Sequence, residues 1–419
     1  MYQVSLKATT FLAPTSRSLL QALRTRLHAP PHRTHIVFSL SLNANEEALN
    51  TIPKLWENSI GCVTAPWPSH SRNTISCAVL EVPFGVGNTF VSTIPGRPPV
   101  QVGRYHSLRR STSDEEYDSS ALSYNLAMQE TSGPKREMQH PIPEGLNPIV
   151  QNMQSFLYFS DLAPEGLTAS LDYYYPQSLK SGLLASSTPF ITGHPVTMFA
   201  NGRTITSGAV GIGMFPQFEG LEHGYDGLES LSEPLKVTSS QGNLVHTLDG
   251  TNPSKLLTSA IASATSTSKS TWAPNPKDED FYLGVLSANG ENFEKVYTIM
   301  SGDPSRGSLA LDGEESPAVG SLVKLLRRPE SESAAIGSNL ATKAKSATFF
   351  NSSKDIIFAA EEEGISSTEN GVTIIEDAFL AASENGLLLS KPASGPRTWK
   401  SSVEGGWSSM SWHVPPPPA

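Results

Sequence analysis

The stretch His35–Ser39 (HIVFS), followed by a helical pattern and then by Ser59–Thr64 (SIGCVT), decides the expected fold. The same order recurs later in the chain as Phe156–Ser160 (FLYFS), a second helical pattern and Ser181–Ser186 (SGLLAS). Each apolar run has the length of a buried strand, and the connection between parallel strands is usually a helix. The pattern therefore predicts two β-α-β units.

The two units also share a spacing. Phe38 stands 23 positions before Gly61 (from 38 to 61), and Phe159 stands 23 positions before Gly182 (from 159 to 182). A constant spacing of similar segments is typical of an internal repeat. We therefore expect an α/β protein of mixed α+β character. Duplicated β-α-β units form a mixed-sheet N-terminal half in which Phe38 and Phe159 are equivalent, and a second α/β half follows.

Composition and charge restrict the function classes. The chain has 419 residues, of which 38% are hydrophobic, and it carries 32 glycines and 32 prolines. This fits folded domains diluted by polar linkers. The formal net charge is −10, and we find no stripe of basic residues with interleaved aromatics. Because phosphate binding needs a basic face, a nucleic-acid partner is not expected.

The cysteines and the apolar runs indicate an intracellular protein without a metal centre. Cys62 and Cys77 are the two cysteines, and a secreted chain of this size usually carries several pairs. No zinc-type spacing occurs, and no apolar run approaches the roughly 20 residues of a membrane helix. We expect no cofactor, no metal and no membrane partner. The expected location is the cytoplasm or nucleus.

The N-terminus leaves a mitochondrial location open. Residues 1–35 contain five basic residues and no acidic one, and Ser18–Leu27 reads as an amphipathic helix. These are features of a mitochondrial presequence. The alternative is an ordinary first helix of the domain, because Leu19, Leu20, Leu23 and Leu27 share one face.

Changes in composition suggest a division of the chain. Residues 1–14 are an N-terminal segment, residues 15–240 a first domain, residues 241–390 a second domain, and residues 391–419 a C-terminal tail. The first domain is expected to contain a disordered insertion at 104–145, and the second a linker at 328–345. The insertion offers basophilic and acidic-directed kinase contexts at Thr112 and Ser113, which are candidate phosphorylation sites.

The small-residue runs carry a family resemblance. Gly182–Ser186 and the later Ser207–Gly213 (SGAVGIG) resemble the N-terminal half of a FIST domain, and Ser59–Cys62 resembles its earlier strand. The resemblance implies a sensory domain for small ligands, amino acids among them. Leu183 stands where a second glycine is usual.

The later part of the chain resembles the C-terminal FIST half. Val245–Gly250 followed by Pro253 is similar to its opening, and Gly307–Leu311 with Val319–Leu325 resemble its closing strands. The chain is thus similar to a fungal-type FIST protein and to the eukaryotic F-box protein that carries a FIST domain. That relative implies an adaptor role in ubiquitin-dependent degradation. Because only about 14 residues precede the expected FIST region, the role would need a separate partner.

Four residues of the first FIST-like half are candidates for ligand binding: Gly182, Ser186, Gly208 and Gly211. Glycines within strands let a ligand approach a sheet, or they allow close packing of side chains. In the second half, Asp249 offers a carboxylate to a ligand amine, or it is a plain turn residue. Arg306 offers a bidentate clamp for a ligand carboxylate, or it is a solvated turn arginine.

No catalytic constellation is evident. The chain has no G-x-S-x-G elbow, no H-E-x-x-H and no P-loop, and the glycines around Gly211 lie inside a predicted strand rather than before a helix. We therefore expect a non-catalytic module that binds and senses a small ligand. The alternatives are a protein-interaction adaptor linked to an SCF-type ubiquitin ligase and, third, an unrecognised hydrolase.

Overall fold

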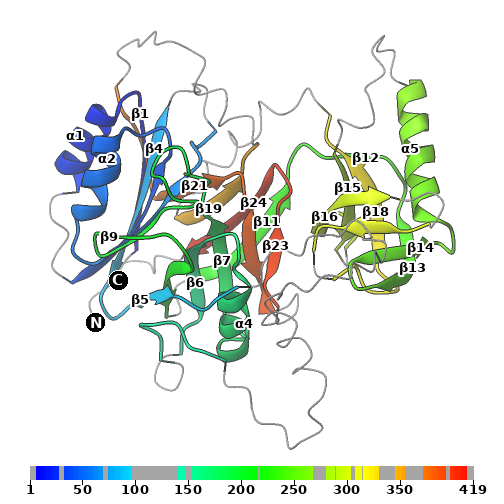
Figure 1. Ribbon diagram of the computed structural model, residues 1–419, viewed down its shortest axis with the longest axis horizontal. Coiled ribbons are helices and arrows are strands. Elements are labelled where there is room, and N and C mark those ends of the chain that lie inside the picture. Colours follow the sequence, from blue (N-terminus) through cyan, green and yellow to red (C-terminus); the bar gives the residue numbers. More distant parts are fainter. Residues whose placement is uncertain are drawn as a thin grey trace, which may run out of the picture.

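The structure is a computed structural model that places strands and a few helices in a mixed α and β fold, which confirms the expected class. It describes residues 6–27, 33–68, 74–96, 140–147, 152–215, 218–267, 280–287, 289–302, 307–313, 315–329, 345–353, 371–392 and 397–412. Figure 1 shows three sheets with their helices beside a separate small barrel.

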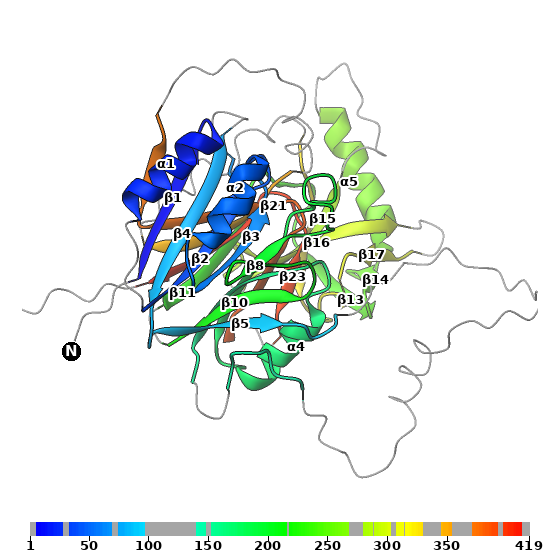
Figure 2. The ribbon, with the colours of Figure 1, turned by 60° about the vertical axis from the view of Figure 1, so that its left-hand side comes forward.

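The first sheet contains the first expected β-α-β unit. Its order is β20 (Thr373–Glu376), β1 (Lys7–Ala13), β4 (Ile75–Pro83), β2 (Thr34–Ser41), β3 (Ser59–Thr64), β8 (Met198–Ala200) and β9 (Arg203–Ile205). Strands β2 and β3 pair in parallel. One face is covered by α1 (Ser16–Arg26), α2 (Glu46–Thr51) and the 3-10 turn Ile52–Lys54, as Figures 1 and 2 show.

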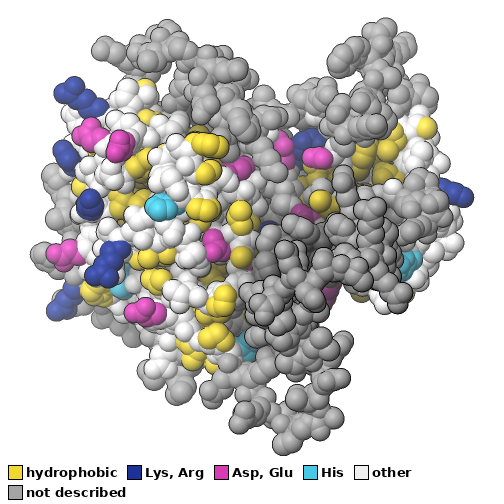
Figure 3. Space-filling view, in the orientation of Figure 1, with side chains coloured by type: hydrophobic (Ala, Val, Ile, Leu, Met, Phe, Trp, Pro, Cys, Tyr) yellow, Lys and Arg dark blue, Asp and Glu magenta, His cyan; other side chains and the backbone are white. Residues whose placement is uncertain are grey.

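Helix α1 forms as the core-helix interpretation predicts. Thr15 caps its first turn by accepting the Ser18 backbone N–H, and Leu19, Leu20 and Leu23 are buried against the sheet. Figure 3 shows basic side chains along the edge of the molecule on the α1 side. None of the helices in the described part of the chain is long and apolar enough to span a membrane.

The second sheet contains the second β-α-β unit. Its order is β23 (Trp399–Ser401), β22 (Leu387–Ser390), β7 (Leu179–Leu184), β6 (Ser155–Ser160), β10 (Ala209–Met214) and β5 (Gly87–Ser92). Strands β6 and β7 pair in parallel and are connected through α4 (Glu165–Tyr174). Leu167 and Leu171 bury the inner face of α4, as their helical spacing predicts.

The two units do not match in the register that the sequence suggested. Gly61 lies opposite Phe38, but Gly182 lies opposite Tyr158. Because successive side chains of a strand point to opposite faces, Tyr158 faces the helix as Phe38 does, whereas Phe159 faces the core between the sheets. The expected equivalence of Phe38 and Phe159 is therefore wrong by one residue. The duplication itself stays a prediction.

A third sheet is built mostly from the last part of the chain. Its order is β11 (Phe218–Tyr225), β24 (Gly406–Trp412), β19 (Ser346–Asn351) and β21 (Ala378–Ser383), and β19 and β21 are parallel. The inner faces of all three sheets enclose one apolar cluster, to which Val37, Phe159 and Phe349 each contribute. This shared core joins the three sheets into one unit.

The remaining strands close into a barrel. Its members are β12 (Glu229–Ser230), β13 (Leu235–Gln241), β14 (Leu244–Leu248), β15 (Phe281–Leu286), β16 (Phe293–Gly302), β17 (Leu309–Leu311) and β18 (Leu322–Arg327), with α5 (Pro253–Thr267) alongside. Strand β18 pairs with both β13 and β15, which closes the sheet. Where the chain enters and leaves the barrel, Arg328 Nη2 donates to the Asp226 carbonyl at 3.1 Å.

The sheets therefore group the chain differently from the expected segments. Strands β20 and β22 belong to the expected second domain at 241–390, yet they pair with β1 and β7. Strands β19 and β21 also belong to that segment, and they share a sheet with β11. The expected tail at 391–419 contributes β23 and β24 to the central sheets. Turn residues mark the ends of strands, but they do not reveal which sheet a strand joins.

Candidate functional site

The glycines expected to admit a ligand lie against side chains of the protein. A Cβ atom on Gly182 would lie 2.5 Å from the Tyr158 ring, and one on Gly211 would lie 2.4 Å from the Phe90 ring. These separations are far below van der Waals contact. The space beside both glycines is thus filled by aromatic rings, which pack beneath α4 with Leu167 and Leu171.

The other expected residues separate into two regions. Ser186 is buried just after β7, and Gly208 precedes β10 with φ of +82° and donates its N–H to Asp161 Oδ2 at 2.6 Å. Both lie at the edge of the second sheet where β6 and β7 end. Asp249 lies in the barrel, in a turn where it accepts the Lys236 N–H at 3.1 Å. Arg306, Thr112 and Ser113 fall outside the described residues.

A cavity of about 520 Å³ opens at the amino ends of β6 and β7. We call it the α4 cavity, because the end of α4 forms part of its wall. It is lined by Asn152, Met153, Gln154, Ser155, Tyr174, Tyr175, Pro176, Gln177, Ser178, Leu179 and Phe218. Its volume lies within the range of small-molecule sites.

Two buried hydroxyl groups of this lining have no hydrogen-bond partner. Ser155 is 2% exposed and Tyr175 is 6% exposed, and neither side-chain oxygen is bonded. Buried polar groups in folded proteins almost always have a partner, and leaving one unmade costs about 1–3 kcal/mol. Two residues that line the α4 cavity therefore each carry a buried hydroxyl whose hydrogen bonding is unmet.

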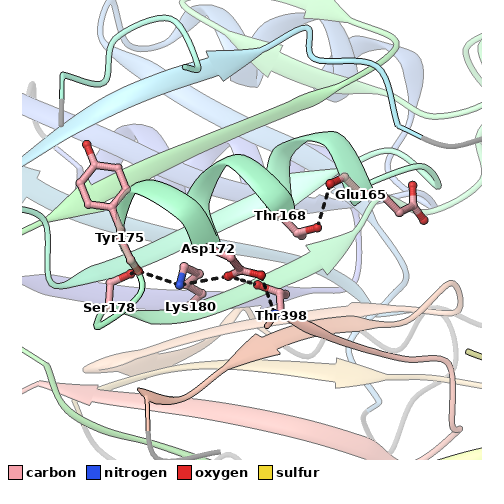
Figure 4. A network of polar contacts seen from close by, with 7 residues as sticks. All are labelled: Glu165, Thr168, Asp172, Tyr175, Ser178, Lys180 and Thr398. Carbon is pink, nitrogen blue, oxygen red and sulfur yellow. Dashed lines mark hydrogen bonds and ion pairs between the residues drawn. The ribbon is translucent and has the colours of Figure 1, made fainter. Parts of the chain in front are cut away.

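Beside the cavity lies a buried charged network around Asp172 and Lys180, which we call the α4 network and which Figure 4 shows. The Lys180 side chain is fully buried, and its Nζ donates to the Tyr175 carbonyl at 2.9 Å and lies 3.1 Å from Asp172 Oδ1. Pro176 follows Tyr175 and ends the helix because it lacks an N–H. The Tyr175 carbonyl at the end of α4 is thereby left for Lys180 and for Ser178 Oγ, at 2.7 Å.

The network perturbs the titration of its members. Burial lowers the pKa of Lys180, and the neighbouring Asp172 carboxylate counteracts that shift. Burial also raises the pKa of Tyr158 well above its usual value, and Asp172 adds to this. Burial raises the pKa of Tyr175 to about 12. Both phenols are therefore neutral at physiological pH and can donate hydrogen bonds.

The network continues toward the barrel through Thr398. Its backbone N–H and its Oγ1 both donate to Asp172, at 2.7 and 2.8 Å. The next residue, Trp399, stacks edge-on against Tyr297 of β16 at 4.6 Å between ring centroids, and Lys295 Nζ lies 5.5 Å from its ring. Two consecutive residues thus contact the α4 network on one side and the barrel on the other.

The chemistry of the lining indicates the ligands that would fit. Hydroxyl, amide and aromatic groups line the α4 cavity, and none of its lining side chains carries a charge. Such a lining favours a largely uncharged ligand that can both donate and accept hydrogen bonds. Within the described ranges, no group of three or more His, Cys, Asp or Glu could hold a metal ion. Cys62 and Cys77 are free and buried, and burial raises the pKa of both thiols.

The sequence contained one indication of this site that was missed. Lys180 interrupts the apolar strand Leu179–Leu184, and a charged residue in such a strand is buried and needs a partner. Asp172 follows the buried Leu171 on α4, but the helical pattern alone does not make it the partner. Thr398 gave no indication, because its contact with Asp172 spans 226 positions.

Comparison with known protein families gives one match. The model of the FIST N domain matches residues 59–251. The match supports a FIST domain protein. The FIST domain is a signalling-type domain and not a known enzyme family. The matched span includes the α4 cavity, Asp172 and Lys180.

The comparisons do not extend to the finer parts of the resemblance. The match ends at residue 251, so it leaves all but the opening of the expected C-terminal FIST half unmatched. It shows neither the fungal type nor the F-box relative. No curated protein matches the chain. No solved structure matches it either.

Proposed function

We propose that this FIST domain protein senses a small molecule that binds in the α4 cavity. The observation that carries the proposal is a cavity of about 520 Å³ whose lining includes two residues with buried, unpartnered hydroxyls, Ser155 and Tyr175. Hydrogen bonds to a ligand would satisfy both groups, so binding gains an interaction that the free protein lacks.

The path to a response runs through the α4 network. A ligand that contacts Tyr175 fixes the position of the Tyr175 carbonyl, which accepts a hydrogen bond from Lys180. Lys180 forms an ion pair with Asp172. Asp172 in turn binds Thr398, whose neighbour Trp399 packs on the barrel. Binding in the cavity therefore biases how firmly the barrel is held, and this differential interaction is what a sensor requires.

The ligand class is proposed in two parts. Amino acids are the class that the resemblance implies. The uncharged lining supports ligands such as polyols, nucleosides or amides more directly, because a zwitterion would lack a charged side chain to pair with. A panel should therefore contain the common amino acids as one arm and uncharged metabolites as the other.

A thermal-shift screen of the full chain tests the proposal. We expect at least one compound to raise the Tm by about 2 °C or more at ten times its Kd, with a further rise that follows the logarithm of its concentration. The shift should fall in Tyr175→Phe and Ser155→Ala, and it should disappear in Gln177→Trp, which narrows the cavity. Gln241→Trp, an exposed glutamine of the barrel, is the matched control. An absence of any shift across the panel would remove the support.

The Tyr175→Phe variant separates binding from folding. Because the Tyr175 hydroxyl has no partner, its removal should leave the free protein as stable as the wild type, or more stable by about 1 kcal/mol. The same change should weaken ligand binding. A protein in which Tyr175 is merely structural would lose stability instead.

A second candidate function is the protein-interaction adaptor, with SCF-type ligases as the proposed context. Phe190 is fully exposed and Ile191 is 42% exposed, both in the loop between β7 and β8. Exposed apolar side chains of this size suit a protein contact. Affinity purification of the wild type and Phe190→Ser tests this, because a stoichiometric partner lost only in the variant would favour the adaptor.

The hydrolase alternative has one observation in its favour. His246 Nδ1 lies 3.0 Å from Ser308 Oγ in the barrel. The hydrogen bonds of the described residues supply no carboxylate to orient that histidine, as a catalytic triad would require. An assay of Ser308→Ala with generic ester substrates tests it, and activity that survives the change rejects this pair.

Finer assignments are also proposals. We assign the barrel strands β14 to β18 to a FIST C-like half and the location to the cytoplasm or nucleus. The opening and closing motifs of the sequence support the first assignment, and two free, buried cysteines support the second.

A further inference from the structure

The carboxyl ends of three strands, β3, β7 and β21, meet at one place in the core unit. The Ser186 N–H donates to the Val63 carbonyl at 3.2 Å, and the Ala65 N–H donates to the Ala382 carbonyl at 2.8 Å. Asn385 Nδ2 completes the triangle by donating to the Ala185 carbonyl at 2.8 Å. We call this place the triple junction. It joins the second strands of all three parallel pairs.

A buried carboxylate lies at the triple junction. Glu384 follows β21 directly and is 7% exposed. Its Oε1 accepts the Ser187 N–H at 2.8 Å and Asn385 Nδ2 at 3.1 Å. Its Oε2 is buried and has no partner. Half of this carboxylate is therefore held by the protein, and the other half is left without a hydrogen bond.

Among the described residues, the surroundings of Glu384 supply further oxygens and no ion-pair partner. Ser186, which directly precedes Ser187, is fully buried, and its Oγ also has no partner. Cys62 lies against both residues, and Glu384 adds to the burial that keeps this thiol protonated. Among the ion pairs of the described residues, no Lys, Arg or His reaches Glu384.

An unpaired carboxylate in such a place is costly. Buried charges in proteins are almost always paired, because the lost hydration is not otherwise replaced. Lys180 illustrates the rule at the other end of β7, where Asp172 accompanies it. Glu384 departs from this pattern, and a positive charge that donates to, or is coordinated by, its Oε2 atom would complete the site.

We propose that the triple junction binds a compact monovalent cation, either the ammonium head of a small amine or an inorganic ion of similar size. Glu384 Oε2 supplies the countercharge, and Ser186 Oγ supplies a second oxygen acceptor. The site is independent of the α4 cavity, because the cavity opens at the amino end of β7 and the junction lies beyond its carboxyl end.

Thermal unfolding of the full chain in matched chloride salts tests this inference. The probes are ammonium, methylammonium and potassium chloride. Tetramethylammonium chloride at equal ionic strength is the control salt, since its cation has no N–H group and is too large for a closed site. We expect the wild-type Tm to rise by about 2 °C at ten times Kd and to increase further with the logarithm of the cation concentration. The rise should be lost in Glu384→Gln, which keeps the Oε1 contacts, and reduced in Ser186→Ala.

The controls make the outcomes decisive. Glu57→Gln removes an exposed carboxylate elsewhere and should respond as the wild type does. In tetramethylammonium chloride, Glu384→Gln should be at least as stable as the wild type, because it removes an unpaired buried charge. A response to methylammonium but not potassium assigns an amine, and the reverse assigns an inorganic ion. A Tm that is the same in all four salts, or a rise that persists in Glu384→Gln, overturns the proposal.

Discussion

Replacing Asp172 by alanine should destabilise the protein more than removing the lysine that it accompanies. Asp172→Ala leaves the Lys180 ammonium fully buried, with the Tyr175 carbonyl as its remaining contact. Breaking a buried ion pair in this way costs about 3–5 kcal/mol. Alanine favours helix, so the effect does not come from the propensity of α4.

The opposite change is milder. In Lys180→Met, Asp172 keeps both donors from Thr398, and its side chain is already 15% exposed. The loss should be close to one hydrogen bond to a charged group, about 1.5–3 kcal/mol. In the Lys180→Met background, Asp172→Ala should cost much less than it does alone, because no buried ammonium remains.

Denaturant unfolding followed by tryptophan fluorescence measures these differences in unfolding free energy. The measurement is repeated over a range of pH. Because the pKa of Lys180 is lowered on folding, the unfolded chain binds more protons than the folded one, so stability rises with pH up to about 10.5. The destabilisation by Asp172→Ala should shrink along that rise. Two results would refute a buried charged pair. One is a loss of stability under about 1 kcal/mol in Asp172→Ala, and the other is a loss in Lys180→Met that exceeds the loss in Asp172→Ala.

Three further predictions follow from packing and burial. Gly182→Ala forces a Cβ into the Tyr158 ring and should cost about 1–3 kcal/mol in denaturant unfolding, whereas Gly220→Ala, which meets open space, should be neutral. Burial and the nearby Lys391 lower the pKa of His223, so the stability of the protein should fall as the pH drops below 6.5. His223→Gln should flatten that part of a plot of Tm against pH. An unchanged slope in this variant would contradict the prediction. Cys62 and Cys77 should not react with iodoacetamide at pH 7.5 until the chain unfolds, because burial keeps both side chains as thiols. Mass spectrometry measures the labelling, and rapid labelling of the native protein would contradict this prediction.

The local patterns of the sequence predicted most single elements. The apolar runs gave β2, β3, β6 and β7, and the leucine stripe gave α1. The hairpin of β8 and β9 turns at Asn201-Gly202, a dipeptide that favours such turns, and both residues have positive φ. These features depend on neighbouring residues alone, so one sequence is sufficient to find them.

Long-range pairing was not accessible in the same way. The strands after residue 345 join sheets that contain strands from before the barrel, so the whole barrel lies between these partners in the sequence. Nothing in an apolar run specifies its partner strand. The one-residue register error had a similar origin, since Tyr158 and Phe159 are both large aromatics and only the pairing with Gly182 distinguishes them.

The candidate residues of the sequence and the sites proposed from the structure overlap at one position, Ser186. The sequence directed attention to the strand from Gly182 to Ser186, and the triple junction does contain Ser186. It did not indicate Glu384, Asp172 or Thr398, because each meets its partner through the fold rather than through a motif. The α4 cavity depends on the shape of a helix end and two strand ends, and no residue spacing encodes that shape.

Isothermal calorimetry of the best stabilising compound with wild type, Gln177→Trp and Gln241→Trp tests the central claim most directly. A ligand of the α4 cavity should bind the wild type and Gln241→Trp with equal Kd and one site per chain, and its affinity should fall at least tenfold in Gln177→Trp. Equal binding by all three proteins would contradict a sensor site beneath α4.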